Sequence, residues 1–329
     1  AANGVEVTVV TTPPHYPGWA VSGGYGNRYS GGTENNVRVY RAPLLLRRNM
    51  RGLWRFLAPA SFALTSAPVV FWQILLRRPD TVLCVEPTLL AAPVAQLAAW
   101  LVGARTVLHV QDLEVDAAFA VGHLADRSWL KTLGFAFEGL MLRRFRKVVT
   151  ISDRMAAKLE EKDVSPGRLA VARNWVDLSC LYPMDEPSPY RAELGYGGDD
   201  FVVLYSGTIG AKQRLDVLLD AAERLKGDSS IKFVIAGEGP AKDELERRYR
   251  HLPSVRFLPF QPYVRLNAFL NMADLHVLPQ EKGIVDLVLP SKLGGMLASG
   301  KPVLVTADEG TELAAFLDDA ATRVPPGDA

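Results

Sequence analysis

This chain has no excess of charge of either sign. Its 37 Lys and Arg residues nearly balance its 36 Asp and Glu residues, which leaves a net charge of +1 over 329 residues. A protein that binds nucleic acid through phosphate contacts carries a basic field. The composition therefore indicates that nucleic acid is not a partner.

Cysteine is scarce, and the two that are present, Cys84 and Cys180, lie far apart in the sequence. They form no metal-ligand spacing, and nothing pairs them as a disulfide framework. Free thiols are typical of a reducing compartment. The cysteines thus predict a cytoplasmic protein without a metal site.

Apolar residues make up 48% of the chain, and its length is enough for two domains of about 150 residues each. Strand-like runs alternate with helical patterns such as Arg214–Leu225, Lys242–Arg250 and Arg265–Met272. This order is typical of α/β proteins with parallel sheets and helices on both faces. The predicted strands are Val5–Thr11, Val37–Arg41, Thr81–Val85, Thr106–Val110, Lys147–Ile151, Leu169–Ala172, Phe201–Tyr205, Lys232–Ala236, Val255–Phe257, Leu275–Leu278 and Pro302–Thr306.

The proline-rich segment Leu181–Pro189 has the composition of a linker between two doubly wound units. We therefore expect one Rossmann-like domain over residues 1–180 and a second over residues 181–329. Two such domains facing across a cleft bind ligands at the carboxyl ends of their strands. Ala1–Gly4 resembles the end of a helix, and Val324–Ala329 stops where another helix is expected. We expect a first βα unit before the chain and further helices after it.

The segment Phe56–Leu76 has no charged residue and is flanked by arginines. Three structures are open for it. It can be a buried core helix, a membrane-spanning helix, or a helix whose face docks on a membrane with arginines on anionic lipid. Its prolines and polar residues, and the core-like strand that follows, argue against a span.

Two segments predict anion sites where a strand leads into a helix. In Leu289–Thr306, Ser291 and Lys292 stand at the start of a short apolar helix, where free backbone N–H groups favour phosphate. In Phe201–Asp216, glycines and cations stand between strand and helix. Both can also be ordinary connections with solvated cations, and the weaker glycine loop Ala236–Pro240 has the same alternative.

Several motifs, in order along nearly the whole chain, resemble family 4 of the retaining glycosyltransferases. They include Ser206–Lys212, Gly237–Pro240, Pro290–Leu293 and Ala298–Val303. In the first half, Thr11–Pro17, Gly103–Asp112 and Asn174–Asp177 look like the branch of the colanic acid biosynthesis glycosyltransferase.

This resemblance implies a GT-B fold with a nucleoside-diphosphate sugar, GDP- or UDP-linked, in the C-terminal domain and an acceptor in the N-terminal domain. It also implies retention of anomeric configuration and no bound metal or other cofactor. The leaving diphosphate gains negative charge, which fixed cations must meet. The residues expected on the donor side are Gly207, Thr208, Lys212, Arg214, Gly237, Glu238, Ser291 and Lys292.

Within this site the resemblance assigns Lys212 and Lys292 to binding of the diphosphate, whereas the role of Arg214 is inferred from its charge. Asp286 is assigned to sugar hydroxyls, or else caps a helix or turn. The family's usual glutamate is replaced here by Gly295, and an arginine common in the family is replaced by Thr208. The family's glycine-rich N-terminal loop is also absent, and a chain without it can be inactive.

On the acceptor side the candidates are His109, Asp112 and Glu114, at a predicted strand end. A carboxylate such as Asp112 can orient or deprotonate an acceptor hydroxyl. His109 can equally be a core histidine, and Glu238 an exposed loop carboxylate.

These expectations together predict a hexosyltransferase of surface polysaccharide synthesis, with a lipid-linked oligosaccharide as acceptor. Its expected location is the inner face of the plasma membrane, as a peripheral protein. Two other classes stay open: a nucleotide-sugar epimerase on the same fold, and a non-catalytic membrane scaffold that binds nucleotide sugar.

Overall fold

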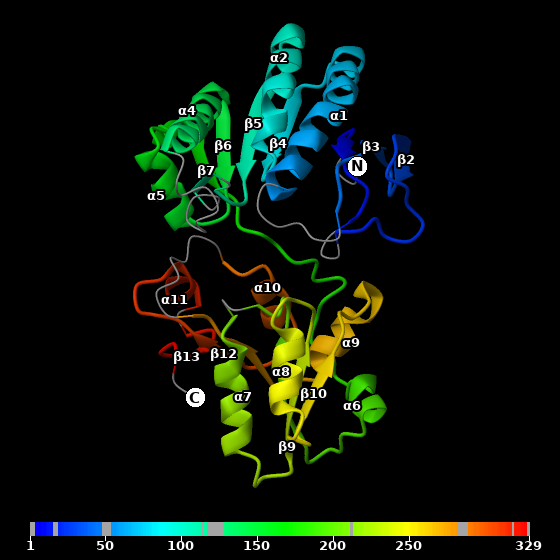
Figure 1. Cartoon of the computed structure of the whole chain (residues 1–329), viewed down its shortest axis with the longest axis vertical. Helices are drawn as coiled ribbons and strands as arrows, with labels where there is room; N and C mark the ends of the chain where they lie inside the picture. The colour runs from blue at the N-terminus through cyan, green and yellow to red at the C-terminus, as the bar shows by residue number, and fades with distance from the viewer. Residues whose placement is uncertain are drawn as a thin grey trace. The chain divides into compact units, whose positions relative to one another are not determined.

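The computed structural model describes residues 4–15, 19–47, 54–113, 115–116, 128–210, 213–281, 289–317 and 319–327. The chain forms two compact units, Ala1–Ala172 and Arg173–Ala329 (Figure 1). Residues 173–180, which the sequence assigned to the first domain, thus belong to the second unit. Both units are α/β, as predicted.

The first unit contains two sheets. In the larger one the strands β4 (Thr81–Glu86), β5 (Arg105–Val110), β6 (Lys147–Thr150) and β7 (Leu169–Val171) are parallel and in that order. In the smaller one β3 (Val37–Arg41) pairs in parallel with β1 (Thr8–Thr11) and antiparallel with β2 (Ser30–Glu34). The connecting helices are α1 (Trp54–Arg77), η1 (Leu89–Ala91), α2 (Ala92–Val102), α4 (Ser128–Arg144), α5 (Asp153–Glu161) and η2 (Pro166–Arg168).

Strand β2 was not predicted, because its five residues are exposed and none is a large apolar residue. Its hairpin with β3 is nevertheless encoded locally. Asn35 and Asn36 form the turn with φ values of 48° and 62°. Asparagine tolerates this left-handed conformation, and two such residues form the tight turn that joins antiparallel strands.

The second unit has one six-stranded parallel sheet, in the order β10-β9-β8-β11-β12-β13. Its strands are β8 (Phe201–Ser206), β9 (Ile231–Ala236), β10 (Val255–Leu258), β11 (Leu275–Leu278), β12 (Val303–Thr306) and β13 (Thr322–Val324). Its helices are α6 (Pro189–Leu194), α7 (Leu215–Arg224), α8 (Lys242–Tyr249), η4 (Tyr263–Arg265), α9 (Leu266–Asn271), α10 (Lys292–Ala298) and α11 (Glu312–Leu317).

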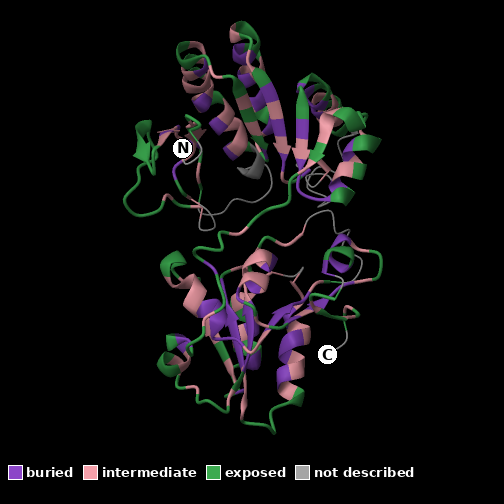
Figure 2. Cartoon of the chain, turned by 180° about the vertical axis from the view of Figure 1, so that it is seen from behind, coloured by how far each residue is buried: buried purple, intermediate pink, exposed green. Residues whose placement is uncertain are grey.

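Both faces of this sheet are covered, and β8 shows how. Val203 and Tyr205 pack in one cluster with residues of α7 and α8, whereas Val202 and Leu204 pack in another with residues of α9. The strand is consequently apolar at successive positions, as expected for a parallel strand buried on both sides. Figure 2 shows the central strands of this unit as largely buried.

The order of the strands places a switch point beside β8. Strands β8, β9 and β10 follow one another towards one edge of the sheet, and β11, β12 and β13 towards the other. In open α/β sheets ligands bind at the carboxyl ends of the strands, where the order reverses. The loops that follow β8 and β11 therefore border the expected ligand site.

Candidate functional site

Two glycine loops meet at the carboxyl ends of β8 and β9. Gly207 N–H donates to the Ala236 carbonyl over 2.9 Å, and Ile209 N–H donates to the Glu238 carbonyl over 2.9 Å. A Cβ on Gly237 would lie only 1.8 Å from the Gly207 carbonyl oxygen, and Gly237 has a φ of +150°. Glycine is thus required for the loops to approach backbone to backbone.

Lys292 lies across the first of these loops. Its Nζ would be 2.9 Å from a Cβ placed on Gly207, and its Cδ 3.0 Å, so the missing side chain of Gly207 makes room for the lysine. The Nζ atom donates to the Tyr205 hydroxyl over 2.8 Å and lies 4.1 Å from the centre of its ring. The lysine that the sequence placed at a helix start is therefore held at the end of β8.

Tyr205 is fully buried, and its hydroxyl holds the amine of this lysine in place. Its hydroxyl donates to the Thr208 carbonyl over 2.6 Å, which leaves an oxygen lone pair for the lysine. Burial raises the pKa of Tyr205, so the hydroxyl stays protonated. Sequence reasoning did not select Tyr205, because nothing local links it to a residue 87 positions away.

The electrostatics of Lys292 are those of a cation kept partly out of water. Burial lowers its pKa from 10.5 to about 7, because desolvation disfavours the charged form. Among the described residues Lys292 forms no ion pair. An incoming anion would supply the compensating charge, which suits this lysine to a phosphate group.

The other described donor-side candidates are more exposed or already paired. Arg214 stands just before α7, as its N-cap residue in a left-handed conformation, and its guanidinium forms a two-pronged ion pair with Asp216, with contacts of 2.9–3.2 Å. Glu238 accepts from Lys242 over 2.9 Å. Thr208 and Ser291 are exposed.

Three predicted site residues lie outside the described residues: Glu114, Lys212 and Asp286. Within the described part of the chain, no group of three or more His, Cys, Asp or Glu residues has metal-binding geometry.

In the first unit, His109 and Asp112 lie at the carboxyl end of β5. His109 is half-buried, burial lowers its pKa, and its Nε2 is 3.4 Å from Gln111 Nε2. Asp112 follows two residues after the strand and is exposed. A neutral imidazole and an accessible carboxylate at a strand end fit an acceptor hydroxyl better than a phosphate.

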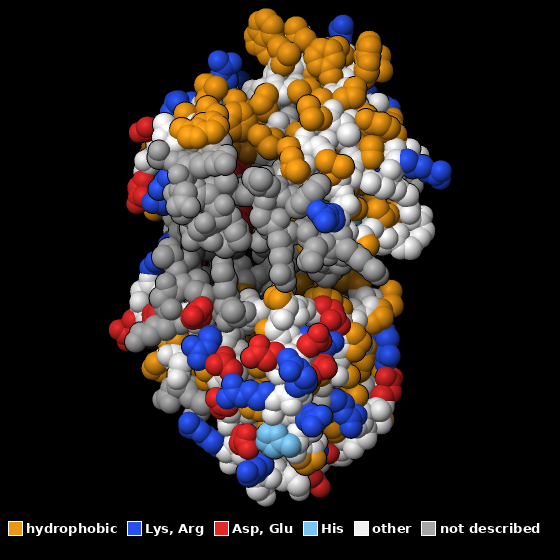
Figure 3. All heavy atoms as spheres, in the orientation of Figure 1, with side chains coloured by type: hydrophobic (Ala, Val, Ile, Leu, Met, Phe, Trp, Pro, Cys, Tyr) orange, Lys and Arg blue, Asp and Glu red, His pale blue; other side chains and the backbone are white. Residues whose placement is uncertain are grey.

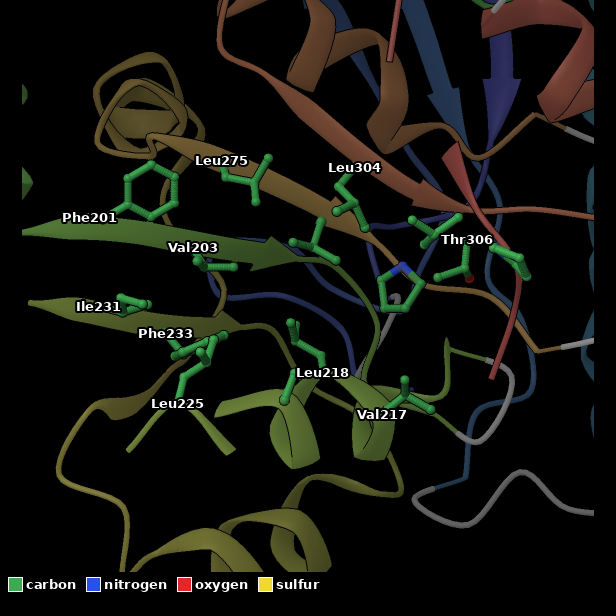
Figure 4. A pocket seen from close by; sticks show the side chains of 15 residues that line it. Phe201, Val203, Val217, Leu218, Leu225, Ile231, Phe233, Leu275, Leu304 and Thr306 are labelled. Carbon is green, nitrogen blue, oxygen red and sulfur yellow. The ribbon is translucent and has the colours of Figure 1, made fainter. Parts of the chain in front are cut away.

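The second unit also has an apolar hollow of about 500 Å³ between α7 and the sheet (Figure 4). Val203, Phe233 and Leu304 are among its lining residues, and Thr306 is the single polar one among the described residues that line it. Among the described residues this lining has no charged group that could meet a diphosphate, in contrast to Lys292 beside the glycine loops.

Comparisons with known proteins agree with this division of the chain. Residues 1–175 match the model "Glycosyl transferase 4-like domain", and residues 188–322 match "Glycosyl transferases group 1". The Escherichia coli K12 protein named "Putative colanic acid biosynthesis glycosyl transferase WcaI" is 38% identical over 322 residues, which cover 95% of this chain and 78% of that protein. The "Probable glycosyltransferase WbjE" of Pseudomonas aeruginosa is 24% identical, over 77% of this chain and 64% of its own length.

Solved structures share the fold. Anabaena Alr3699/HepE, solved in complex with UDP-glucose, superposes with a TM-score of 0.60 and 15% identity, over 89% of this chain and 73% of its own. Sucrose-phosphate synthase from Thermosynechococcus elongatus superposes with a TM-score of 0.64 and 15% identity, over 99% and 77%. The two parallel-sheet units are thus the Rossmann-like domains of a GT-B fold.

Proposed function

The chain belongs to the glycosyltransferases whose two domain models it matches, and we propose that it transfers a hexose, with retention, from a nucleoside-diphosphate sugar to a lipid-linked saccharide. The proposed setting is surface polysaccharide synthesis, which the name of the E. coli relative supports. The donor carries UDP or GDP, and the complex of HepE with UDP-glucose supports this donor class.

One observation carries the proposal: the amine of Lys292 lies over the glycine loop after β8, at the switch point of the sheet. Glycosyl transfer breaks the bond between the sugar and the diphosphate, and negative charge develops on the leaving oxygen. A fixed amine stabilises that charge more in the transition state than in the ground state. Gly207 leaves room for this amine and Gly237 lets the second loop lie against the first, so both loops are part of the proposed donor site.

The remaining roles are part of the proposal: those of Lys212 and Asp286 follow the family positions, and those on the acceptor side follow from the chemistry of the side chains. Lys212 joins Lys292 on the diphosphate, and Asp286 holds hydroxyls of the donor sugar. In the first unit, Asp112 orients the acceptor hydroxyl and accepts its proton, with His109 and Glu114 beside it. No metal is part of this scheme, because lysines meet the developing charge.

Calorimetric titration of UDP- and GDP-sugars into the protein tests the donor site. Lys292→Ala is expected to weaken donor binding by about 1.5–3 kcal/mol, the usual loss for a hydrogen bond to a charged group. Lys226→Ala is the matched control, because Lys226 is exposed and contacts only Glu223 among the ion pairs of the described residues. An unchanged affinity in the Lys292 variant would remove this residue from the site.

A second measurement separates transfer from the other two classes. A transferase releases nucleoside diphosphate only when a lipid-linked acceptor is present. An epimerase converts the nucleotide sugar without an acceptor, and a scaffold binds it without turnover. Both outcomes would contradict the proposed reaction while leaving the donor site in place.

A further inference from the structure

Helix α1 presents an apolar stripe to solvent. Leu64 is 77% exposed, Trp72 59% and Leu76 71%, and Leu57 and Pro68 are exposed as well. Leu57 and Leu64 are seven residues apart, and each of the later positions follows the previous one by four residues. All five positions therefore lie on one face of the helix. In the most apolar window of α1 only 17% of the residues are buried, which excludes a wholly buried core helix.

The opposite face of α1 belongs to the folded unit. Ile74 packs in one cluster with residues of α2, and Phe62 packs in another with Ala42 and Leu44. The helix is long and apolar enough to cross a membrane by length and composition. A span would, however, remove α1 from these contacts and from β4, which begins at Thr81.

Helix α2 continues the apolar stripe. It packs against α1, and its outward positions are Pro93, Leu97, Trp100 and Leu101, with Trp100 75% exposed. Residues 57–76 and 87–104 contain no charged side chain at all. We name the exposed positions of the two helices the α1–α2 face, and Figure 3 shows hydrophobic side chains gathered over this part of the unit.

Cations border the α1–α2 face at one end. Helices α1, α2 and α4 each lead into a strand of the same parallel sheet. Their carboxyl-terminal ends therefore lie together, near the amino-terminal ends of those strands. Exposed arginines lie at these helix ends. In the sequence segments 77–81, 102–106 and 144–148 that follow them, Asp80 is the one acidic residue. These arginines are Arg77, Arg78, Arg105, Arg144 and Arg146.

We propose that the α1–α2 face docks on a bilayer of anionic phospholipid, with Trp72 and Trp100 at the level of the headgroups and the arginines on lipid phosphates. Tryptophan favours the membrane–water interface, and arginines beside an apolar face add electrostatic attraction to anionic lipid. A second copy of the chain is a poorer occupant, because a two-fold contact over this end brings like charges together. This surface deepens the proposed function, whose acceptor is lipid-linked, and rests on it.

Co-sedimentation of the full chain with vesicles tests the surface. Vesicles that contain phosphatidylglycerol are expected to bind the protein, pure phosphatidylcholine vesicles much less, and added salt to weaken the binding. The double variant Leu76→Gln with Trp100→Gln is expected to lower binding about a hundredfold, because each of the two large apolar side chains that leave water contributes about tenfold. Arg78→Gln with Arg105→Gln is expected to lower it about fivefold per arginine.

Tyr263→Gln with Val264→Gln is the matched control, because both residues are highly exposed but lie in the second unit. Equal loss in this control, or full vesicle binding by the Leu76 and Trp100 variant, overturns the proposal. A dimer that this variant dissociates, with no vesicle binding by the wild type, overturns it in favour of a second copy. Donor titration without vesicles should be unchanged, so failure of this surface and failure of the donor site are distinguishable.

Discussion

Binding of a nucleotide sugar is expected to draw a proton onto Lys292. In the free protein, burial lowers the pKa of this amine to about 7. A bound diphosphate stabilises the charged form and raises the pKa towards its ordinary value of 10.5. Protons then flow from buffer to protein whenever the pH lies above the lowered value and below the raised one.

The size of the effect follows from the two pKa values. At about pH 8 roughly a tenth of the free protein carries the proton, so binding takes up about 0.9 proton per site. At about pH 6 the amine is already charged, and the uptake falls to about 0.1 proton. The same linkage makes donor binding about tenfold weaker at about pH 8 than at about pH 6, since charging the amine then costs about 1.4 kcal/mol.

Calorimetry in buffers of different ionisation enthalpy measures this uptake directly. An intact nucleotide sugar is the suitable ligand, because its doubly esterified diphosphate does not titrate near neutrality. Lys292→Met is expected to abolish the uptake that appears between about pH 6 and 8, whereas the exposed Lys226→Met keeps it.

Two results would refute the reasoning. If the heat of binding does not depend on the buffer at about pH 8, Lys292 is either charged in the free protein or remote from the diphosphate. If Lys292→Met keeps the full uptake, another group takes the proton. In either case the lowered pKa of Lys292 does not control donor binding.

Two further predictions concern the residues around this lysine. Gly237→Ala is expected to lower the free energy of unfolding in urea by about 2–4 kcal/mol, because the new Cβ would clash with the backbone of the neighbouring loop. Gly210→Ala meets only the side-chain end of Gln213, so a loss as large there would contradict the backbone argument. Tyr205→Phe keeps the ring but removes the hydroxyl, and is expected to weaken donor binding by about 0.5–1.5 kcal/mol in calorimetry, with the fold intact by circular dichroism. Wild-type affinity in that variant would show that the hydroxyl does not position the lysine.

The strands of the second unit were predictable because burial on both faces leaves continuous apolar runs. Leu275–Leu278, which is apolar except for His276, forms β11 with the predicted bounds, and Phe201–Tyr205 forms β8 with one further residue. Strand β2 was missed because an edge strand pairs through its backbone, so its side chains need not show an apolar pattern. The three-residue strand Thr322–Val324 was also missed, since it is too short to show a period.

The sequence indicated the candidate site only where the chemistry of that site is local. Glycines after a strand and a lysine beside a helix start indicated a phosphate site, and the structure places Lys292 over Gly207. Asp216 stands two residues after Arg214, so their ion pair had a visible signal in the sequence. The contact between Lys292 and Tyr205 had none.

The sequence alone determined the α/β class, the two-domain organisation and the glycosyltransferase family. Periodicity, glycine spacing and the order of the motifs are visible along the chain without knowledge of which segments meet in space. Tertiary structure decided which atoms meet and which faces stay in water. It brought Lys292 to a tyrosine 87 residues away, and it left one face of α1 exposed. Both outcomes depend on packing between segments distant in sequence, and an apolar composition is the same whether a helix face meets protein, lipid or water.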